Sequence, residues 1–399
     1  MSTQLSLARF REDFKALRGA IYLNGAARSI LSDTTMAAID ALLESHRDGS
    51  ARKEDWDPIG KRCTQRFAEL IGAGAHEIAY TKNVSDGINT VARAFPWRRG
   101  DNVIVCGDLE HPNNIYPWLN LRALGVEVRL VAQRDDAIDT QAIAAAIDAR
   151  TRVVSAATVS FTPGFRTELH RLADPCRRRG ILLMVDAVQS TGILHLDMAA
   201  AGIDALATAT SKGLLGLYGL GFLYVSQRWI DRLHPAYLAR FSVDQGTAHE
   251  SEMGAAQFRL QPDARRFEVG HQPWACVAAA DASLGQLLAL GTPVIEAHAT
   301  ALAERLAHGF AVLGLPLCRT PAGTPASHIV TLGRLGEGGA YSTGDERLNT
   351  IAQVLEAHAV RFSVRRGLLR FATHAYSSED DVDRVLDLAR DAVRTRRSA

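Results

Sequence analysis

The chain has 399 residues, of which 47% are hydrophobic and 22% are charged, with 45 basic residues against 44 acidic ones. This length exceeds what one simple core needs, so we expect a large domain with a smaller companion. A formal net charge of +1 argues against nucleic acid as a main partner.

The cysteines are scattered along the chain without a pairing pattern. They show neither CxxC spacing nor histidine neighbours at zinc-ligand spacing, so we expect no disulfide framework, no metal site and a reducing compartment. They are Cys63, Cys106, Cys176, Cys276 and Cys318. The segment from Met1 to Phe14 mixes charged with apolar residues, which argues against a signal peptide or a membrane span. We therefore expect a cytoplasmic protein without membrane contact.

From about residue 76 to residue 225, short apolar runs alternate with amphipathic helical stretches. The runs are His76–Thr81, Asn102–Cys106, Val126–Val131, Arg152–Thr158, Ile181–Val185, Ala205–Thr210 and Gly221–Val225. Candidate helices between them are Asp86–Phe95, Thr140–Ala149 and Leu169–Arg179. This alternation predicts an α/β domain with a largely parallel sheet covered on both faces. Ligands of such sheets collect at the carboxyl ends of the strands.

After Val225 the pattern changes. The polar stretch Ser242–Arg266 has few periodic apolar positions, which predicts a long loop beside a site. Two further helices and two strands then indicate a smaller α+β domain. The helices are Ala275–Leu290 and Pro293–Leu313, and the strands are Ser327–Leu332 and Leu368–Ala372.

Two neighbouring strands of the predicted sheet end on charged residues. The run Ile181–Val185 leads into Asp186, and the run Ala205–Thr210 leads into Ser211 and Lys212. A lysine that ends an apolar strand loses water, so its neutral amine, which condenses with aldehydes, becomes accessible near neutral pH. A buried carboxylate nearby would hold a proton on a pyridine nitrogen and make that ring an electron sink. Asp186 and Lys212 therefore form the two halves of a predicted pyridoxal-5'-phosphate (PLP) site.

Both residues also have structural explanations. Asp186 alone is as compatible with a helix cap or a salt bridge as with catalysis, and Lys212 alone would suit the start of a surface loop. The glycines between Gly213 and Gly221 favour tight packing instead of an open loop. They do not match GxGxxG and do not follow a first strand, so a dinucleotide site and hydride chemistry are disfavoured.

The phosphate of such a cofactor would lie where Thr81–Ser85 enters the helix expected to begin near Asp86. Free backbone N–H groups and the helix dipole favour an anion at that point. Ser85 taken by itself is better explained as a plain N-cap of the helix.

Several longer stretches carry a resemblance. They are Tyr22–Ala27, Thr81–Ala92, Glu110–Trp118, Asp186–Ser190, Ser211–Lys212, Gly219–Val225, Phe267–Gly270 and Leu369–Tyr376. In these stretches, which span nearly the whole chain, the sequence resembles the class V aminotransferase family of fold type I PLP enzymes. That family includes cysteine desulfurases, selenocysteine lyases, carbon–sulfur lyases, isopenicillin N epimerases and kynureninases. These stretches in this order indicate the family more specifically than any one of them does alone.

The resemblance implies an architecture. A large PLP-binding domain with a mainly parallel seven-stranded sheet would span residues 21–285. A smaller α+β domain would span residues 286–399, with residues 1–20 packing against it. The family's homodimers share active sites, and here Gly270 and His271 would approach the phosphate of the neighbouring subunit.

The resemblance also implies individual roles. Lys212 would hold the cofactor and act as base, Asp186 would face the ring nitrogen, and Gln189 would bond the phenolic oxygen. His111 would stack on the ring and assist proton transfer, although a lone loop histidine is more often structural or solvated. Arg370 would clamp the substrate α-carboxylate with its two-pronged guanidinium, the alternative being an ion pair within the small domain. Further candidates for substrate contact are Asn24 and Ala26, and more weakly Arg28, Trp56, Tyr116 and Arg166.

The sequence departs from the family pattern at several positions. Phe161 stands where many relatives have Asn, and Val84 replaces a frequent Thr. Ala209 and Ser211 replace the Ser and His that commonly precede the lysine. The phosphate is then expected to be held by backbone groups near Val84 and by the hydroxyls of Ser85, Thr210 and Ser211.

A persulfide-forming desulfurase needs a mobile cysteine shortly before the carboxylate-binding arginine. The segment Val360–Gly367 contains no cysteine, and Cys318 lies far upstream. We therefore expect a PLP-dependent carbon–sulfur β-lyase of specialised metabolism that acts on a cysteine S-conjugate. Lys212 would remove the α-proton while Arg370 holds the carboxylate.

Other reactions at the same carbon stay open. They are oxidative decarboxylation or deamination of an S-conjugate, epimerisation and transamination. An Arg370 that holds the carboxylate in the ring plane counts against decarboxylation. A non-catalytic binding protein with this fold is least expected, because a site without catalytic activity does not require Asp186, Lys212 and Arg370 together.

Overall fold

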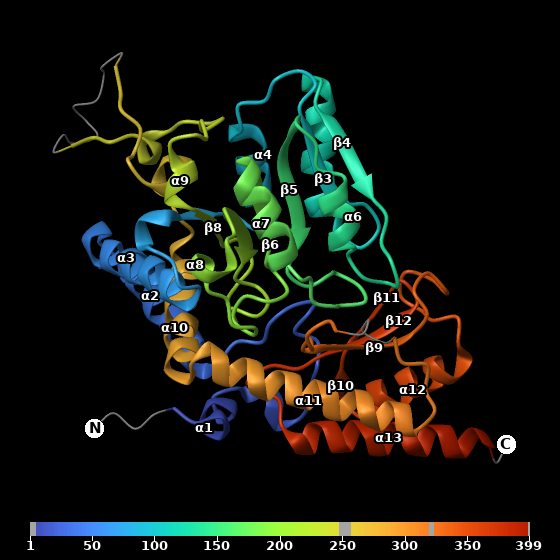
Figure 1. Ribbon diagram of the computed structural model, residues 1–399. Helices are drawn as coiled ribbons and strands as arrows, with labels where there is room; N and C mark the ends of the chain where they lie inside the picture. The colour runs from blue at the N-terminus through green and yellow to red at the C-terminus, as the bar shows by residue number, and fades with distance from the viewer. Residues whose placement is uncertain (1–4, 247–256, 319–322, 398–399) are drawn as a thin grey trace.

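A seven-stranded sheet in the order β2-β8-β7-β6-β5-β3-β4 forms the centre of the larger part of the molecule (Figure 1). The computed structural model describes residues 5–246, 257–318 and 323–397. The strands are β2 (Ile78–Thr81), β3 (Asn102–Cys106), β4 (Glu127–Val131), β5 (Thr151–Ala157), β6 (Leu182–Asp186), β7 (Ala205–Ala209) and β8 (Gly221–Val225). Strands β3 to β7 run parallel, and β8 runs antiparallel to both β2 and β7. Each strand coincides with a predicted apolar run, so the largely parallel sheet is confirmed.

Helices cover both faces of this sheet, which explains why the residues of its strands are almost all buried except in the edge strand β4. Along β3, Val103 faces one apolar core and Ile104 faces the other, because successive side chains of a strand point to opposite sides. Phe67 and Leu172 complete the Ile104 side, and Ile88 of α4 completes the Val103 side. The helices of this part are α2 (Asp33–Arg47), α3 (Lys53–Leu70), α4 (Val84–Ala94), α5 (Tyr116–Leu119), α6 (Thr140–Ala145), α7 (His170–Arg179), α8 (Met198–Ala201), α9 (Gln227–Ile230) and α10 (Trp274–Leu290).

A three-stranded antiparallel sheet in the order β11-β12-β9 forms the smaller part. Its apolar side packs Val330 and Phe371 against Phe310, Leu355 and Val385 from three helices. The elements are β9 (Ile329–Gly333), β11 (Ser363–Arg365), β12 (Leu368–Ala372), α11 (Thr292–Val312), α12 (Glu346–Ala357) and α13 (Glu379–Arg397). Strands β9 and β12 and helices α10 and α11 were predicted, whereas β11 was not.

Several segments connect the larger part with the smaller part. Strand β1 (Ile21–Tyr22) pairs with β10 (Val360–Arg361), and Leu23 belongs to the apolar core of the small part. Helix α10 continues past residue 285 to Leu290 and meets α11 at a bend of 81°. Helix α1 (Leu7–Glu12) carries Arg11, which forms an ion pair with Asp381.

The predicted loop Ser242–Arg266 lies partly outside the described residues, which omit 247–256. In the described part, Val243 bridges to Leu260, and Arg266 is buried and donates to the carbonyl of Ile230. Within the described ranges, no single helix has both the length and the apolar character for crossing a membrane, and only α10 and α11 together, across their bend, meet both conditions.

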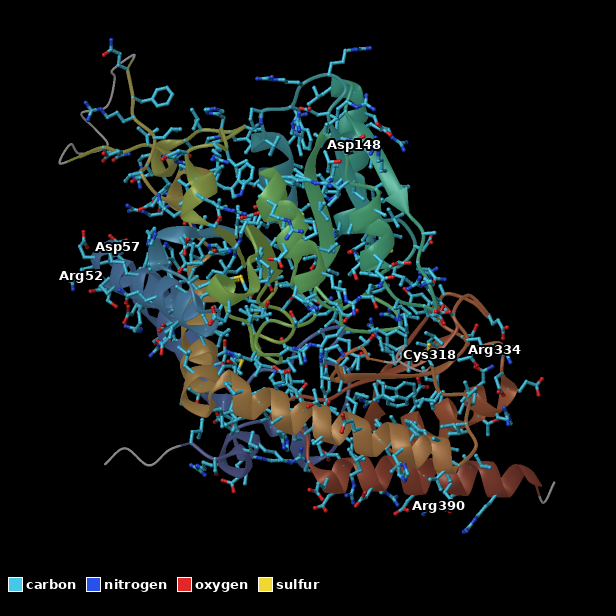
Figure 2. The ribbon with its side chains drawn as sticks, viewed as in Figure 1. Arg52, Asp57, Asp148, Cys318, Arg334 and Arg390 are labelled. Carbon is cyan, nitrogen blue, oxygen red and sulfur yellow. The ribbon has the colours of Figure 1, made fainter. Side chains whose placement is uncertain are left out.

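The parallel strands point their carboxyl ends at the small sheet. In Figure 1 the arrowheads of β4 and β5 face the region of β9, β11 and β12. Figure 2 shows Asp148, which precedes β5, at the opposite end of the sheet. The loops that leave the strands therefore meet the small part, which is where ligands of such sheets bind.

Candidate active site

A cavity of about 390 Å³ lies where the ends of β5, β6 and β7 face the β11–β12 hairpin. It brings together residues that are far apart in the sequence. The predicted site residues along its wall are Ala26, Val84, Ser85, His111, Asp186, Gln189, Ser211, Lys212 and Arg370.

Asp186 and Lys212 reach this cavity from neighbouring strands, as predicted. The carboxylate of Asp186 is buried and accepts a hydrogen bond from the backbone N–H of Val188 at 3.0 Å. Burial raises the pKa of Asp186 to about 6. Burial, followed by the charge of Arg370, lowers the pKa of Lys212 to about 8. At neutral pH Asp186 is thus mainly ionised, and Lys212 has a neutral fraction.

Close packing of the backbone after Lys212 holds this lysine in place. A Cβ atom at Gly213 would lie 2.4 Å from the carbonyl oxygen of Thr191, so only glycine fits there. The carbonyl of Leu214 accepts a hydrogen bond from Ser283 Oγ at 2.8 Å. The tight packing predicted from the glycines is therefore present.

His111 lines the cavity from the segment that follows β3, where it precedes the turn Pro112–Asn114. Its Nδ1 accepts a hydrogen bond from the backbone N–H of Asn113 at 3.2 Å, which places the proton of the neutral ring on Nε2. The ring meets Phe161 edge-on, with centroids 4.8 Å apart. Burial, then the charge of Lys212, lowers the pKa of His111, so the ring is mainly neutral at neutral pH.

Gln189 is buried with an unused hydrogen-bonding atom. Its Nε2 donates to the carbonyl of Ala26 at 3.2 Å, while its Oε1 has no partner. An amide nitrogen carries two hydrogens, so Gln189 keeps a second donor for a ligand.

The first turn of α4 also lines the cavity. Asn83 is the N-cap, and its side chain accepts a hydrogen bond from the N–H of Asp86 at 3.0 Å. Val84 and Ser85 are the first two helical residues and line the cavity, and N–H groups in the first turn of a helix have no intrahelical acceptor. Ser85 is therefore not the N-cap, and the helix begins before Asp86.

Thr210 and Ser211 differ in their placement. The Thr210 hydroxyl donates to the carbonyls of Leu217 and Leu220 and does not line the cavity. Ser211 does line it. Thr210 thus supports the loop that follows Lys212, and Ser211 is the hydroxyl available at the cavity.

Arg370 projects from β12 and is almost fully buried. Its Nε donates to Ser363 Oγ at 3.1 Å and its Nη1 donates to the carbonyl of Phe161 at 2.7 Å. Its Nη2 is buried and has no partner. Among the described residues none of these contacts is a carboxylate, so the predicted alternative of an ion pair within the small part finds no partner there.

Three other predicted residues lie beside the cavity. Asn24 has a buried Oδ1 without a partner, and its backbone bridges to Ala372. Gly270 and His271 line a second cavity of about 960 Å³, which shares Ser85 with the first. Their predicted contact with a neighbouring subunit stays a prediction.

The weaker substrate candidates are engaged elsewhere or lie outside the cavity wall. The carbonyl of Arg28 accepts a hydrogen bond from Tyr22. Trp56 packs between His46 and Trp274, Tyr116 is 68% exposed, and Arg166 pairs with Glu296. The cavity lining thus includes none of these four candidates, Arg28, Trp56, Tyr116 and Arg166.

The sequence did not indicate one carboxyl group and one guanidinium group of the cavity wall. Glu110 is buried and accepts hydrogen bonds from Asn114 Nδ2 at 2.9 Å and from the N–H of Ala157 at 2.7 Å. Burial raises its pKa to about 8. Arg365, on the unpredicted strand β11, is the second. Glu110 begins the stretch Glu110–Trp118 that carried part of the resemblance, which was the available signal.

The residues present fit PLP. Gln189 Oε1 and Arg370 Nη2 are orphaned polar atoms on cavity residues, and buried polar groups of this kind normally bond a ligand or water. The helix terminus at Val84 and Ser85 suits the phosphate, Asp186 the ring nitrogen and Lys212 the aldehyde. No group of three or more His, Cys, Asp or Glu side chains in the described ranges is placed to hold a metal ion.

Comparison with known proteins supports this assignment. The family profile described as aminotransferase class-V matches residues 21–385. A probable cysteine desulfurase of Methanothermobacter thermautotrophicus is 32% identical over 74% of each chain. An uncharacterized aminotransferase of Bacillus subtilis, YcbU, is 26% identical over 95% of this chain and 96% of its own.

Solved structures share the fold. An apo cysteine desulfurase from Thermococcus onnurineus NA1 superposes with a TM-score of 0.85 at 21% identity and covers 99% of this chain and 100% of its own. The cystine C–S lyase C-DES, in complex with cysteine persulfide, reaches a TM-score of 0.81 at 22% identity over 94% of this chain and 99% of its own. The chain therefore belongs to the aminotransferase class-V family of fold type I PLP-dependent enzymes, which act on amino acids.

Proposed function

We propose that this enzyme is a carbon–sulfur β-lyase acting on cysteine S-conjugates. The Cβ–S bond of the substrate breaks and the sulfur leaves as a thiol. With one water consumed, the remaining three carbons become pyruvate and the amine becomes ammonium. No oxidant or reductant is required.

Bound PLP supplies an aldehyde that joins to amines and a ring that accepts electrons from the α-carbon. Arg370 binds the substrate α-carboxylate with the N–H groups that lack a partner. Lys212, whose pKa is lowered to about 8, accepts the proton from the α-carbon. His111, neutral with its proton on Nε2, donates to the departing sulfur.

The observation that carries this proposal is that none of the described residues of the cavity wall is a cysteine. Among the described residues Cys318 lies beside β9, where its N–H bonds to the carbonyl of Thr331 (Figure 2). Cys276 contacts the carbonyl of Tyr218 instead of entering the cavity. A persulfide relay needs a thiolate that reaches the substrate sulfur, and burial raises the pKa of the Cys276 and Cys318 thiols.

The test supplies the purified holoenzyme with a panel of cysteine S-conjugates and follows thiol, pyruvate, carbon dioxide and oxygen. We expect thiol and pyruvate in equal amounts, with neither carbon dioxide release nor oxygen uptake. Lys212→Ala should lower the rate by about 10³-fold or more, because it removes the base. Lys61→Ala, at an exposed position of α3, is the matched control and should match the wild type.

Three outcomes would contradict the proposal. Carbon dioxide with oxygen uptake would assign oxidative decarboxylation. Protein-bound persulfide formed from free cysteine would assign desulfuration. Absence of a visible absorption band after addition of PLP would show that the protein does not bind this cofactor.

A further inference from the structure

The β11–β12 hairpin presents two guanidinium groups to the same cavity. Ser363 pairs with Arg370, and Arg365 pairs with Leu368. Paired residues of an antiparallel ladder share a face, as do residues two apart in one strand. Arg365 and Arg370 therefore stand on one face as diagonal neighbours, about 7–8 Å apart, and both line the cavity.

Arg365 has only uncharged partners among the described residues. Its Nη1 donates to the carbonyl of Val364 at 2.7 Å, and its guanidinium lies 5.1 Å from the ring centre of Tyr341. The charge of Arg365 lowers the pKa of Arg370, after the larger effect of burial. Two like charges that face one cavity without an intervening carboxylate repel each other, and a ligand anion between them would relieve this.

The remaining ionisable groups do not neutralise the pair. Glu110 and Asp186 are the acidic residues of the cavity wall. Glu110 is held by Asn114 and Ala157, and burial raises its pKa to about 8, so it is mainly protonated at neutral pH. Asp186 stands at the end of β6 in the seven-stranded sheet, whereas the two arginines stand on the separate three-stranded sheet. The side of the cavity formed by the hairpin is therefore positively charged.

We propose that Arg365 binds a second anionic group carried by the side chain of the substrate, so that the enzyme selects dianionic amino acids. Arg370 takes the α-carboxylate, and Arg365 takes a carboxylate or sulfonate on the sulfur substituent. The inference rests on the proposed function for the identity of the substrate as a cysteine S-conjugate. The short separation of the two arginines suits a substituent whose anion lies close to the sulfur.

The test compares S-carboxymethylcysteine with S-carbamoylmethylcysteine, which have the same shape but differ by one charge. Binding to the wild-type holoenzyme is titrated by the change in its visible absorption, and pyruvate is measured separately. We expect the acid to bind about 10-fold or more tightly than the amide, as for a hydrogen bond to a charged group. Arg365→Gln should reduce this ratio to about 1, and Arg365→Lys should retain part of it. Arg361→Gln, at an exposed neighbouring position, should leave it unchanged.

The two proposals fail separately. Equal binding of acid and amide by the wild-type enzyme overturns the role of Arg365, whether or not pyruvate forms. A preference for the acid that persists in Arg365→Gln overturns the role of Arg365 as well, because another group then binds the second anion. A preference that depends on Arg365 without any pyruvate supports the anion site and contradicts the lyase.

Discussion

The two sides of the cavity hold their charges in different ways. The floor, formed by the ends of β5, β6 and β7, carries Asp186 and Lys212, with Glu110 beside them. Burial brings the pKa values of these groups to about 6 for Asp186 and about 8 for Lys212 and Glu110, so each gains or loses a proton close to neutral pH. The part of the cavity formed by the β11–β12 hairpin, called the wall from here on, carries Arg365 and Arg370. Their guanidinium groups stay charged at neutral pH.

This difference separates chemistry from recognition. Groups that titrate near neutral pH can exchange protons with a substrate, which is what the floor requires. Permanent planar cations bind carboxylates in fixed geometry, which is what the wall requires. Substitutions on the floor should therefore change the rate of every reaction, while substitutions on the wall should change which substrates bind.

The sharpest test of the wall compares its two arginines. Arg370→Gln should lower kcat/KM about 10²-fold or more for dianionic and monoanionic amino acids alike, because the α-carboxylate loses a charged, two-pronged partner. Arg365→Gln should leave monoanionic amino acids unaffected. Steady-state kinetics on one substrate of each kind measures this. A uniform loss in both variants would contradict separate roles.

A smaller effect is expected from Glu110→Gln on the floor. The carboxyl accepts two hydrogen bonds, and a glutamine amide can accept only one while its nitrogen faces the other donor. At pH 5 we expect a loss of about 1–3 kcal/mol in the free energy of unfolding, measured by urea denaturation. Glu69→Gln, at an exposed position of α3, is the control.

The pH dependence of this loss carries a definite sign. Burial raises the pKa of Glu110 from 4.5 to about 8, so the folded protein binds a proton that the unfolded chain releases. Its contribution is fully present below the unfolded pKa and is lost as pH rises towards 8. The difference between wild type and Glu110→Gln should therefore shrink from pH 5 to pH 8. A difference that grows would show that Glu110 is ionised in the folded state.

The smallest effect concerns the coupling between wall and floor. In the apo protein the rate of PLP capture should rise with pH through about 8, because only the neutral amine of Lys212 reacts with the aldehyde. The charge of Arg365 contributes to lowering this pKa, as the least of the causes. Arg365→Gln should thus move the profile upward by about a few tenths of a pH unit. Stopped-flow absorbance measures it, and a downward shift would contradict the coupling.

Much of the floor was predictable because its signals are local. The central strands are largely apolar runs, since both sheet faces are buried there, and a charged residue close after such a run reaches the carboxyl end of the sheet. Asp186 and Lys212 were found in this way. The resemblance added His111, Gln189 and Arg370, which line the same cavity.

The remaining features depend on contacts between distant segments. The Thr210 hydroxyl turns to the carbonyls of Leu217 and Leu220, and Asn83 replaces Ser85 as the N-cap, because hydroxyl and amide groups bond whichever partner the folded backbone brings near. Arg365 reaches the cavity only through the pairing of β11 with β12. Composition and spacing thus determine which strands form and where they end, whereas the direction of each polar side chain is decided by the neighbours that tertiary packing supplies.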